Sequence, residues 1–295
     1  MDKRVQTVNF IELNLAILFI STSGALGRFI DLPIPITIGL RSLLGGIALY
    51  LFCRWKKISF RIEGKDRKTV VIGGILLGLH WITYFYSLRL SNVAIGMLSL
   101  FTYPAITAIL EPIFLKTKIL KIHLLLSLLV LVGIYFLVPD FDLQNDDFKA
   151  VGFGVLSAFC YATRNIILKT KINQYDGTLL MAYQLLVITL VLSPFAFYLD
   201  TSQVVAYLPA TLLLAILTTA IGHSLFLRSL RHFSTVTASI VSCSQPVYGI
   251  IIGMIFLNEY PEVSTIIGGA IIILTVIIES LRVFRISKPL ANDQN

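Results

Sequence analysis

Long apolar runs recur along the chain, separated by short polar segments. Runs such as LLLSLLVLVGIYFLV are apolar on every face of a helix, whereas the strands of a membrane β-barrel alternate apolar and polar residues. Crossing the hydrocarbon layer of roughly 30 Å takes about 20 helical residues. Ten runs approach that length, near residues 10–30, 34–54, 69–88, 92–115, 120–139, 149–169, 178–199, 208–229, 234–257 and 262–283. We therefore predict an all-α integral membrane protein with ten transmembrane helices.

Two segments 142 residues apart repeat the same pattern. Residues 87–104 read SLRLSNVAIGMLSLFTYP, and residues 229–246 read SLRHFSTVTASIVSCSQP. Extended to Leu115 and Leu257, the alignment has eight identities in 29 positions. Because the offset contains five predicted spans, the second copy would enter the membrane in the opposite orientation. We predict a first five-helix repeat over residues 1–142 and an inverted second repeat over 143–295, which secondary transporters use for alternating access. The alternative is a likeness of composition between two apolar helices.

Basic residues set the expected orientation, because short cytoplasmic loops retain Lys and Arg. With both termini inside, the inner segments hold 19 of the 24 Lys and Arg residues. The outer side keeps Arg28, Arg89 and Lys149, while Arg41 and Arg164 lie within spans. We expect a multi-pass protein of the inner (plasma) membrane, N-in and C-in, contacting anionic lipid. The net charge of +8 is spread over these loops, so no nucleic-acid partner is expected.

Several features together resemble EamA-type members of the drug/metabolite transporter superfamily. They are the order of ten spans, the repeated Ser-Leu-Arg, Pro104 in TYPAITAILEP, Pro246 in SQPVYGIIIGMIFLNEYP, and Arg41 early in the second span. The resemblance implies a 5+5 inverted repeat around a central cavity and transport of small metabolites. The family's acidic residue after the ninth span matches Glu259. The equivalent position in the first half is Thr117, and the nearby acid there is Glu111.

Polar residues in the middle of a span are the candidates for substrate binding, because such groups are costly in a bilayer. His80 lies near the middle of the third span, with Tyr84 one helical turn further on. His223 of the eighth span aligns with Trp81, so the two halves place histidines one position apart. Hydrogen bonding to a neighbouring helix is the structural alternative for both histidines.

Two arginines and two prolines complete the main candidates. A guanidinium offers a planar fork to an anionic group, so Arg41 and Arg164 are substrate-binding candidates. Structural pairing is the alternative for Arg41, and snorkelling to the inner surface for Arg164. Pro104 and Pro246 should kink or open their helices, exposing Tyr103 and Gln245 to the centre, unless the kinks serve packing alone. Secondary candidates are Tyr161 and Gln184.

These residues favour a secondary transporter over an enzyme. No HExxH motif, phosphate-binding glycine loop or clustered acidic pair occurs, so we expect no catalytic residues, metal or cofactor. We predict movement of small polar metabolites by alternating access, with export of amino acids or related compounds favoured by family analogy. Import of a vitamin or nucleoside-like metabolite and a non-transport scaffold remain the alternatives. The assembly is expected to be a monomer or homodimer.

Overall fold

The computed structural model describes residues 3–114, 116, 121–137, 144–233, 235–242 and 244–286, and all regular structure in these ranges is helical. The predicted boundary between residues 142 and 143 lies outside them, as do Thr117 and Cys243, one of the three cysteines of the chain. The helices are α1 (Lys3–Phe29), α2 (Ile34–Trp55), α3 (Gly64–Leu90), α4 (Val93–Leu100), α5 (Tyr103–Phe114), α6 (Lys121–Leu137), α7 (Asp146–Lys169), α8 (Gly177–Leu192), the 3-10 helix η1 (Ser193–Tyr198), α9 (Thr201–Leu213), the π-helix η2 (Leu214–His223), α10 (Ser224–Ser229), α11 (Thr235–Val241), α12 (Ser244–Leu257) and α13 (Val263–Ile286).

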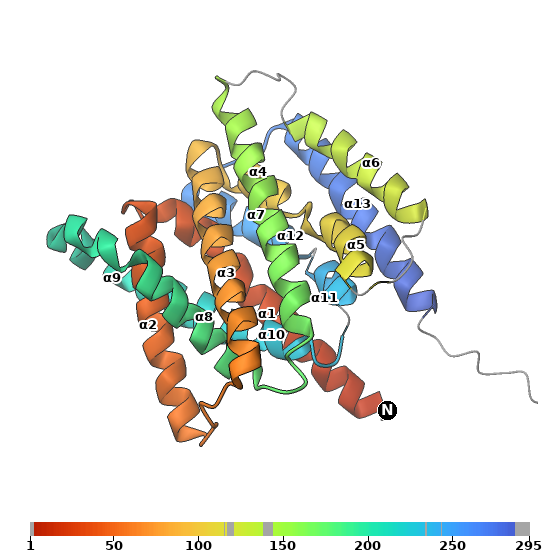
Figure 1. The fold of residues 1–295 in the computed structure, drawn as a ribbon. Coiled ribbons are helices and arrows are strands. Elements are labelled where there is room, and N and C mark those ends of the chain that lie inside the picture. The colour runs from red at the N-terminus through yellow and green to blue at the C-terminus, as the bar shows by residue number, and fades with distance from the viewer. Residues whose placement is uncertain are drawn as a thin grey trace, which may run out of the picture.

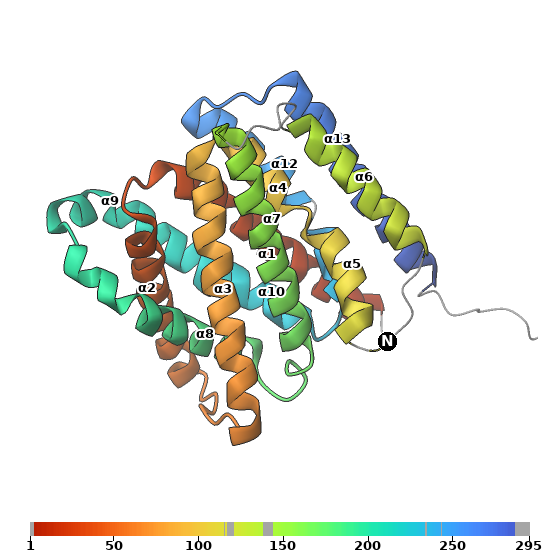
Figure 2. The same ribbon diagram turned by 45° about the horizontal axis from the view of Figure 1, so that its top comes forward.

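The helices pack side by side, with their lateral order set by a few close pairs. Helix α3 packs along α7, α2 along α8, α6 along α13, and α1 along α12 and η2. Figures 1 and 2 show α6 and α13 together at one edge of the molecule, with α2 and α9 at the opposite edge. The centre is thus formed by α1, α3, α4, α7 and the η2–α10 segment.

Polarity is inverted relative to a water-soluble protein. Large apolar side chains face outward, among them Leu190 at 63% and Phe256 at 75% exposure. Arg41, Arg164 and Gln184 are instead completely buried. Because a bilayer solvates apolar surface and disfavours charge, this distribution fits a protein whose outer surface faces lipid.

Seven helical stretches of the described chain have the length and apolar composition needed to cross a membrane. They are Val8–Phe29, Ile34–Trp55, Gly64–Leu90, Val93–Phe114, Asp146–Lys169, Gly177–Tyr198 and Thr201–Ser229. Two shorter apolar helical stretches, Ser244–Leu257 and Val263–Thr275, follow. The all-helical membrane fold is confirmed, while the count of ten spans stays a prediction.

Both mid-span prolines lie directly after an interruption. Helix α4 ends at Leu100 and α5 begins at Tyr103, so Pro104 occupies the first turn of α5. Helix α11 ends at Val241 and α12 begins at Ser244, which places Pro246 in the first turn of α12. Proline is tolerated in a first turn because its missing N–H would have no intrahelical partner there. Each proline therefore starts a new helix within an apolar run.

The 142-residue offset recurs in backbone geometry. The Arg89 guanidinium donates to the carbonyls of Ile30 and Leu32, and the Arg231 guanidinium donates to those of Ile172 and Tyr175. Ile30 and Ile172 are themselves 142 residues apart. Lys116 (φ 56°) and Asn258 (φ 55°), separated by the same interval, both adopt the left-handed conformation after a helix. The arginine at the end of each Ser-Leu-Arg thus forms hydrogen bonds with the loop that precedes the second helix of its half.

Candidate functional site

A polar contact between α3 and α7 anchors the centre of the molecule. His80 Nδ1 lies 2.7 Å from Ser157 Oγ, and the Ser157 hydroxyl donates to the His80 carbonyl at 2.8 Å. Since that hydroxyl has one proton, the ring Nδ1–H must donate to Ser157. His80 Nε2 is then the ring nitrogen that can bind a ligand. The alternative of helix-to-helix hydrogen bonding thus holds for Nδ1 and the carbonyl of His80, while the ligand role stays a prediction that involves Nε2.

Aromatic rings surround this histidine. Tyr161 stacks on His80 with ring centroids 4.4 Å apart, and Tyr103 meets Tyr161 edge-on at 5.1 Å. Trp81 meets His223 edge-on at 5.3 Å. The amphipathic rings offer apolar faces together with polar edges, which suits a metabolite that has both kinds of surface.

These side chains enclose a cavity of about 10 Å3, close to the minimum that holds one water molecule. The cavity is therefore closed around its lining in this conformation. Six of the predicted substrate-binding residues line it: His80, Tyr84, Tyr103, Tyr161, His223 and Gln245. Its other lining residues are Ile20, Ser23, Trp81, Leu100 and Phe101.

Arg41 of α2 lies behind the cavity wall. Its Nε donates to Thr219 Oγ1 at 2.5 Å, and its guanidinium carbon lies 3.8 Å above the centroid of the Trp81 ring. The terminal nitrogens Nη1 and Nη2 are buried and have no hydrogen-bond partner among the described residues. Arg41 is thus a buried cation with most of its donors unused.

Arg164 of α7 is partnered at all three nitrogens. Nε donates to Gln184 Oε1 at 2.7 Å, Nη1 to Asn165 Oδ1 at 2.9 Å, and Nη2 contacts the Met181 sulfur at 3.6 Å. The side chain is completely buried, so the alternative of snorkelling to the inner surface is wrong: Gln184 on α8 holds the guanidinium inside the protein. Arg164 and Gln184 do not line the central cavity.

The π-helix η2 supplies residues from the opposite side. Short π-helical segments, in which each hydrogen bond spans five residues, are frequent at functional sites. Thr219 Oγ1 donates to the Leu214 carbonyl and accepts from Arg41, and Thr218 is hydrogen-bonded to Thr22 of α1 at 2.9 Å. His223 ends the segment, with its Nδ1 buried and lacking a partner in the described part of the chain.

Besides the five further lining residues, the sequence did not mark Ser157 and Thr219, the hydrogen-bond partners of His80 and Arg41. Ser157 precedes Tyr161 by one helical turn on α7, so the shared helix face was a signal for its position. Thr219 lies in TTAIGH, where nothing in the sequence marks the π-helix that turns it toward Arg41.

One end of the molecule is held by a carboxylate with two partners, and we call it the Glu259 end, formed by Arg28, Arg89 and Glu259. Glu259 Oε1 accepts from Arg28 Nε at 2.9 Å, and Oε2 accepts from the Val93 N–H at 2.8 Å. Val93 begins α4, whose N-terminus favours a negative charge. Asn258, in the left-handed conformation, turns the chain at the end of α12 and places Glu259 beside both groups.

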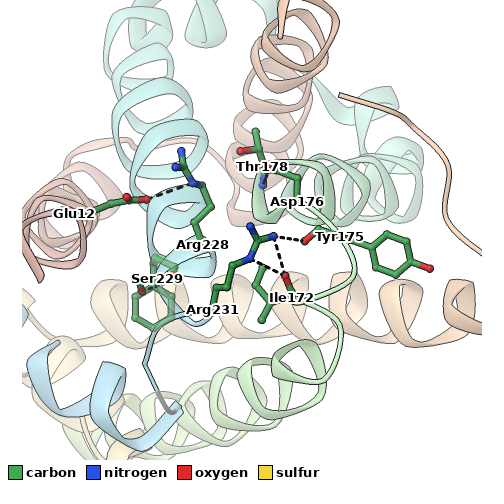
Figure 3. Close-up of polar contacts among 9 residues, drawn as sticks. Glu12, Ile172, Tyr175, Asp176, Thr178, Arg228, Ser229 and Arg231 are labelled. Carbon is green, nitrogen blue, oxygen red and sulfur yellow. Dashed lines mark hydrogen bonds and ion pairs between the residues drawn. The ribbon is translucent and has the colours of Figure 1, made fainter. Parts of the chain in front are cut away.

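The other end contains a smaller ion pair, and we call it the Glu12 end, formed by Glu12, Arg228 and Arg231. Glu12 of α1 lies 3.3 Å from Arg228 of α10, and the Arg231 guanidinium reaches the Ile172 and Tyr175 carbonyls (Figure 3). Glu12 and Arg28 are separated by sixteen residues of α1, roughly 24 Å along its axis, so the two ends lie on either side of the cavity.

The loop at the Glu12 end is fixed by further polar contacts. Asp66 accepts from Lys171 Nζ at 2.7 Å and from the Tyr175 hydroxyl at 2.7 Å. Desolvation, together with the bond to Asp66, raises the pKa of the Tyr175 hydroxyl, which therefore stays a donor at neutral pH. Asp176 caps α8 by accepting from the Thr178 N–H at 2.8 Å, and both residues are drawn in Figure 3. Within the described ranges, no three His, Cys, Asp or Glu side chains gather as metal ligands.

Both halves of the chain match one known family. Residues 11–138 and 148–281 each match the model of the EamA-like transporter family. The chain belongs to the EamA-like transporter family. The family expected from the repeated motifs is therefore confirmed, and this family member is a multi-pass membrane transporter of small molecules rather than an enzyme.

Similar proteins agree with this assignment. The chain is 27% identical over 255 residues to the pseudopaline exporter CntI of Pseudomonas aeruginosa, covering 83% of this chain and 86% of the exporter. It is 21% identical over 250 residues to the uncharacterized transporter YwfM of Bacillus subtilis, covering 83% and 84% of the two chains. A solved crystal structure has the same fold, with a TM-score of 0.70, 15% sequence identity and coverage of 96% and 99%.

Proposed function

We propose that the protein is a secondary carrier that exports small polar metabolites, with amino acids or related compounds as the substrate class. The observation that carries this proposal is the closed central cavity, which is lined by both family-matched segments. A site shared between two halves can be exposed first to one side and then to the other when the halves rock. The match to a protein named as an exporter supports the direction.

The proposed architecture has ten spans in two inverted repeats, with both termini inside. Two family matches along one chain support a duplication. The packing supports it as well, because contacts between helices recur in the two halves. Helix α3 packs on α7, and their counterparts, the η2–α10 segment and α1, pack on each other. Helices α4 and α5 also pack on α7, and α12, the counterpart of α5, packs on α1. The pairs α2 with α8 and α6 with α13 join counterparts of the two halves. This orientation would place the Glu12 end inside and the Glu259 end outside the inner membrane.

Exchange of substrates without an ion gradient fits the distribution of acidic residues. Four acidic residues lie inside the predicted spans, Glu12, Glu111, Glu262 and Glu279, and each lies near an end of its span. A carboxylate at mid-depth is the usual means of coupling transport to protons. We therefore expect counterflow to proceed with the same pH on both sides.

Counterflow in proteoliposomes tests the function. Vesicles are loaded with a pool of amino acids and small metabolites, and uptake of labelled members of the pool is followed. His80→Ala should lower uptake about 10-fold, because a hydrogen bond to the substrate is lost. His232→Ala is the matched control, since His232 is exposed and does not line the cavity. Folded protein that shows no counterflow with any member of the pool would contradict the proposal.

A further inference from the structure

We infer that Arg41 binds a carboxylate of the transported compound, which narrows the substrate class to small organic acids, including amino acids with a free carboxylate. This inference rests on the proposed transport function. It assigns the charged group of the substrate to one named residue of the protein.

The first support is the state of the Arg41 side chain. It is completely buried, yet only Nε has a hydrogen-bond acceptor, and both terminal nitrogens lack one among the described residues. Unsatisfied buried polar groups are rare, and a buried charge without a partner costs more than a neutral group. Such a cation is expected where a ligand supplies the missing anion.

Arg164 is the internal comparison for that point. It is equally buried and is contacted at Nε, Nη1 and Nη2 by Gln184, Asn165 and Met181. The protein therefore provides partners where an arginine is structural. At Arg41 it leaves the two parallel N–H donors that fit the two oxygens of a carboxylate.

The second support is the position of Arg41. Its guanidinium lies over the face of Trp81 at 3.8 Å, and Trp81 also lines the central cavity. One ring thus separates the free donors from the cavity, and movement of Trp81 would join them. The cation–π contact stabilises the guanidinium while the site is closed, and a carboxylate would replace or strengthen that contact.

The charge of the site favours a carboxylate over a phosphate group. Arg41 contributes a single positive charge with two unused donors, which matches a monoanion. The charge on Arg164 is already hydrogen-bonded to Gln184 and Asn165, so a dianion would lack a second free cation.

Trp81 provides a direct binding signal, because the chain has only two tryptophans. The other, Trp55, is 72% exposed, so Trp55→Phe leaves Trp81 as the only tryptophan, whose emission can be excited selectively over that of tyrosine. The purified full-length variant is titrated with L-glutamate, lactate and L-histidine, and in parallel with their primary amides. We expect carboxylates to change the Trp81 emission and the amides to bind about 10-fold or more weakly.

Two charge variants complete the test. Arg41→Gln should abolish the response, and Arg41→Lys should leave a weaker one, because Lys keeps the charge but lacks the fork. Arg61→Gln, which removes an exposed arginine, should respond as the parent does. If Arg41→Gln does not fold, the inference is tested by whether Arg41→Lys responds more weakly than the parent.

The outcomes separate this inference from the proposed function. Three results would each overturn the inference. They are equal binding of acids and amides, no response to any probe, and an undiminished response in Arg41→Gln, or in Arg41→Lys if Arg41→Gln does not fold. If counterflow persists in those cases, the transport function stands with a different substrate class. If counterflow is absent for every compound while the Arg41-dependent response is present, the transport function fails and the binding site stands.

Discussion

The two ends of the molecule are closed by ion pairs of unequal strength. Glu259 has two charge-assisted or dipole-assisted partners, Arg28 and the N–H of Val93, and its side chain is 21% exposed. Glu12 has one partner, Arg228, at 3.3 Å, and its side chain is 24% exposed. Exposed ion pairs contribute about 0.2–1 kcal/mol, while a carboxylate at a helix N-terminus gains roughly a further 0.3–1 kcal/mol.

This difference indicates which end opens more readily. The Glu259 carboxylate joins the segment after α12 to both α1 and α4, whereas the Glu12 carboxylate joins α1 to α10. In the proposed orientation the inner end would then open first, and the cavity would be loaded from the cytoplasm. Preferential loading from inside agrees with export.

The largest predicted effect comes from the arginines that hold loops at both ends. Arg89→Ala and Arg231→Ala each free two backbone carbonyls from a charged donor. We expect each variant to lose about 2–3 kcal/mol of stability, which lowers Tm by roughly 4–12 °C. Thermal unfolding in detergent measures the loss, with Arg61→Ala as the charge-matched control. Because the two contacts are alike, unequal losses would show that the repeat does not extend to their energetics.

The next effect concerns the stronger ion pair. Glu259→Gln keeps the shape of the side chain but removes the charge that Arg28 and the start of α4 bind. A loss of about 0.5–2 kcal/mol shifts the equilibrium toward opening at that end by roughly 2- to 30-fold. The measurement is the labelling rate of Ser23→Cys, a cavity residue, by an impermeant thiol reagent in a cysteine-free background. In right-side-out vesicles, Ser23→Cys should be labelled faster in the Glu259→Gln variant than in the parent. An unchanged labelling rate would contradict the role of this ion pair.

A smaller change is expected at the other end. Glu12→Gln removes a single exposed pair worth about 0.2–1 kcal/mol, so labelling of Ser23→Cys from the inside should rise about 1.5- to 5-fold. Inside-out vesicles with the same reagent give the rate. A larger effect for Glu12→Gln than for Glu259→Gln would reverse the ranking of the two ends.

The sequence predicted the helices and most of the central site, because both depend on the bilayer. Charge and hydrogen-bonding groups are costly in hydrocarbon, so the polar residues of apolar spans, such as His80, His223 and Tyr161, marked the interior. The prolines marked helix interruptions for a local steric reason, and the structure has a break directly before Pro104 and Pro246.

Contacts between distant helices could not be predicted in the same way. The bond from Arg41 to Thr219 depends on a π-helix that the residues of η2 do not signal. Likewise, Arg164 lies near the predicted inner end of its span, but α7 and α8 both pack against α3, which places Gln184 within reach of Arg164 and buries the guanidinium. The hydrogen-bond partner of each of these arginines is set by tertiary packing. The spacing of residues along one helix does not predict contacts with another helix.

The most direct test of alternating access is to lock each end separately. Cysteines replacing Arg28 and Glu259, or Glu12 and Arg228, are bridged by a bifunctional thiol reagent whose spacer can be cleaved, in a cysteine-free background, and counterflow is measured before and after cleavage. Alternating access predicts that either bridge alone stops counterflow and that cleavage restores it, because both ends must open in turn. Counterflow that continues at the parent rate with either bridge fully formed would contradict alternating access through the central cavity.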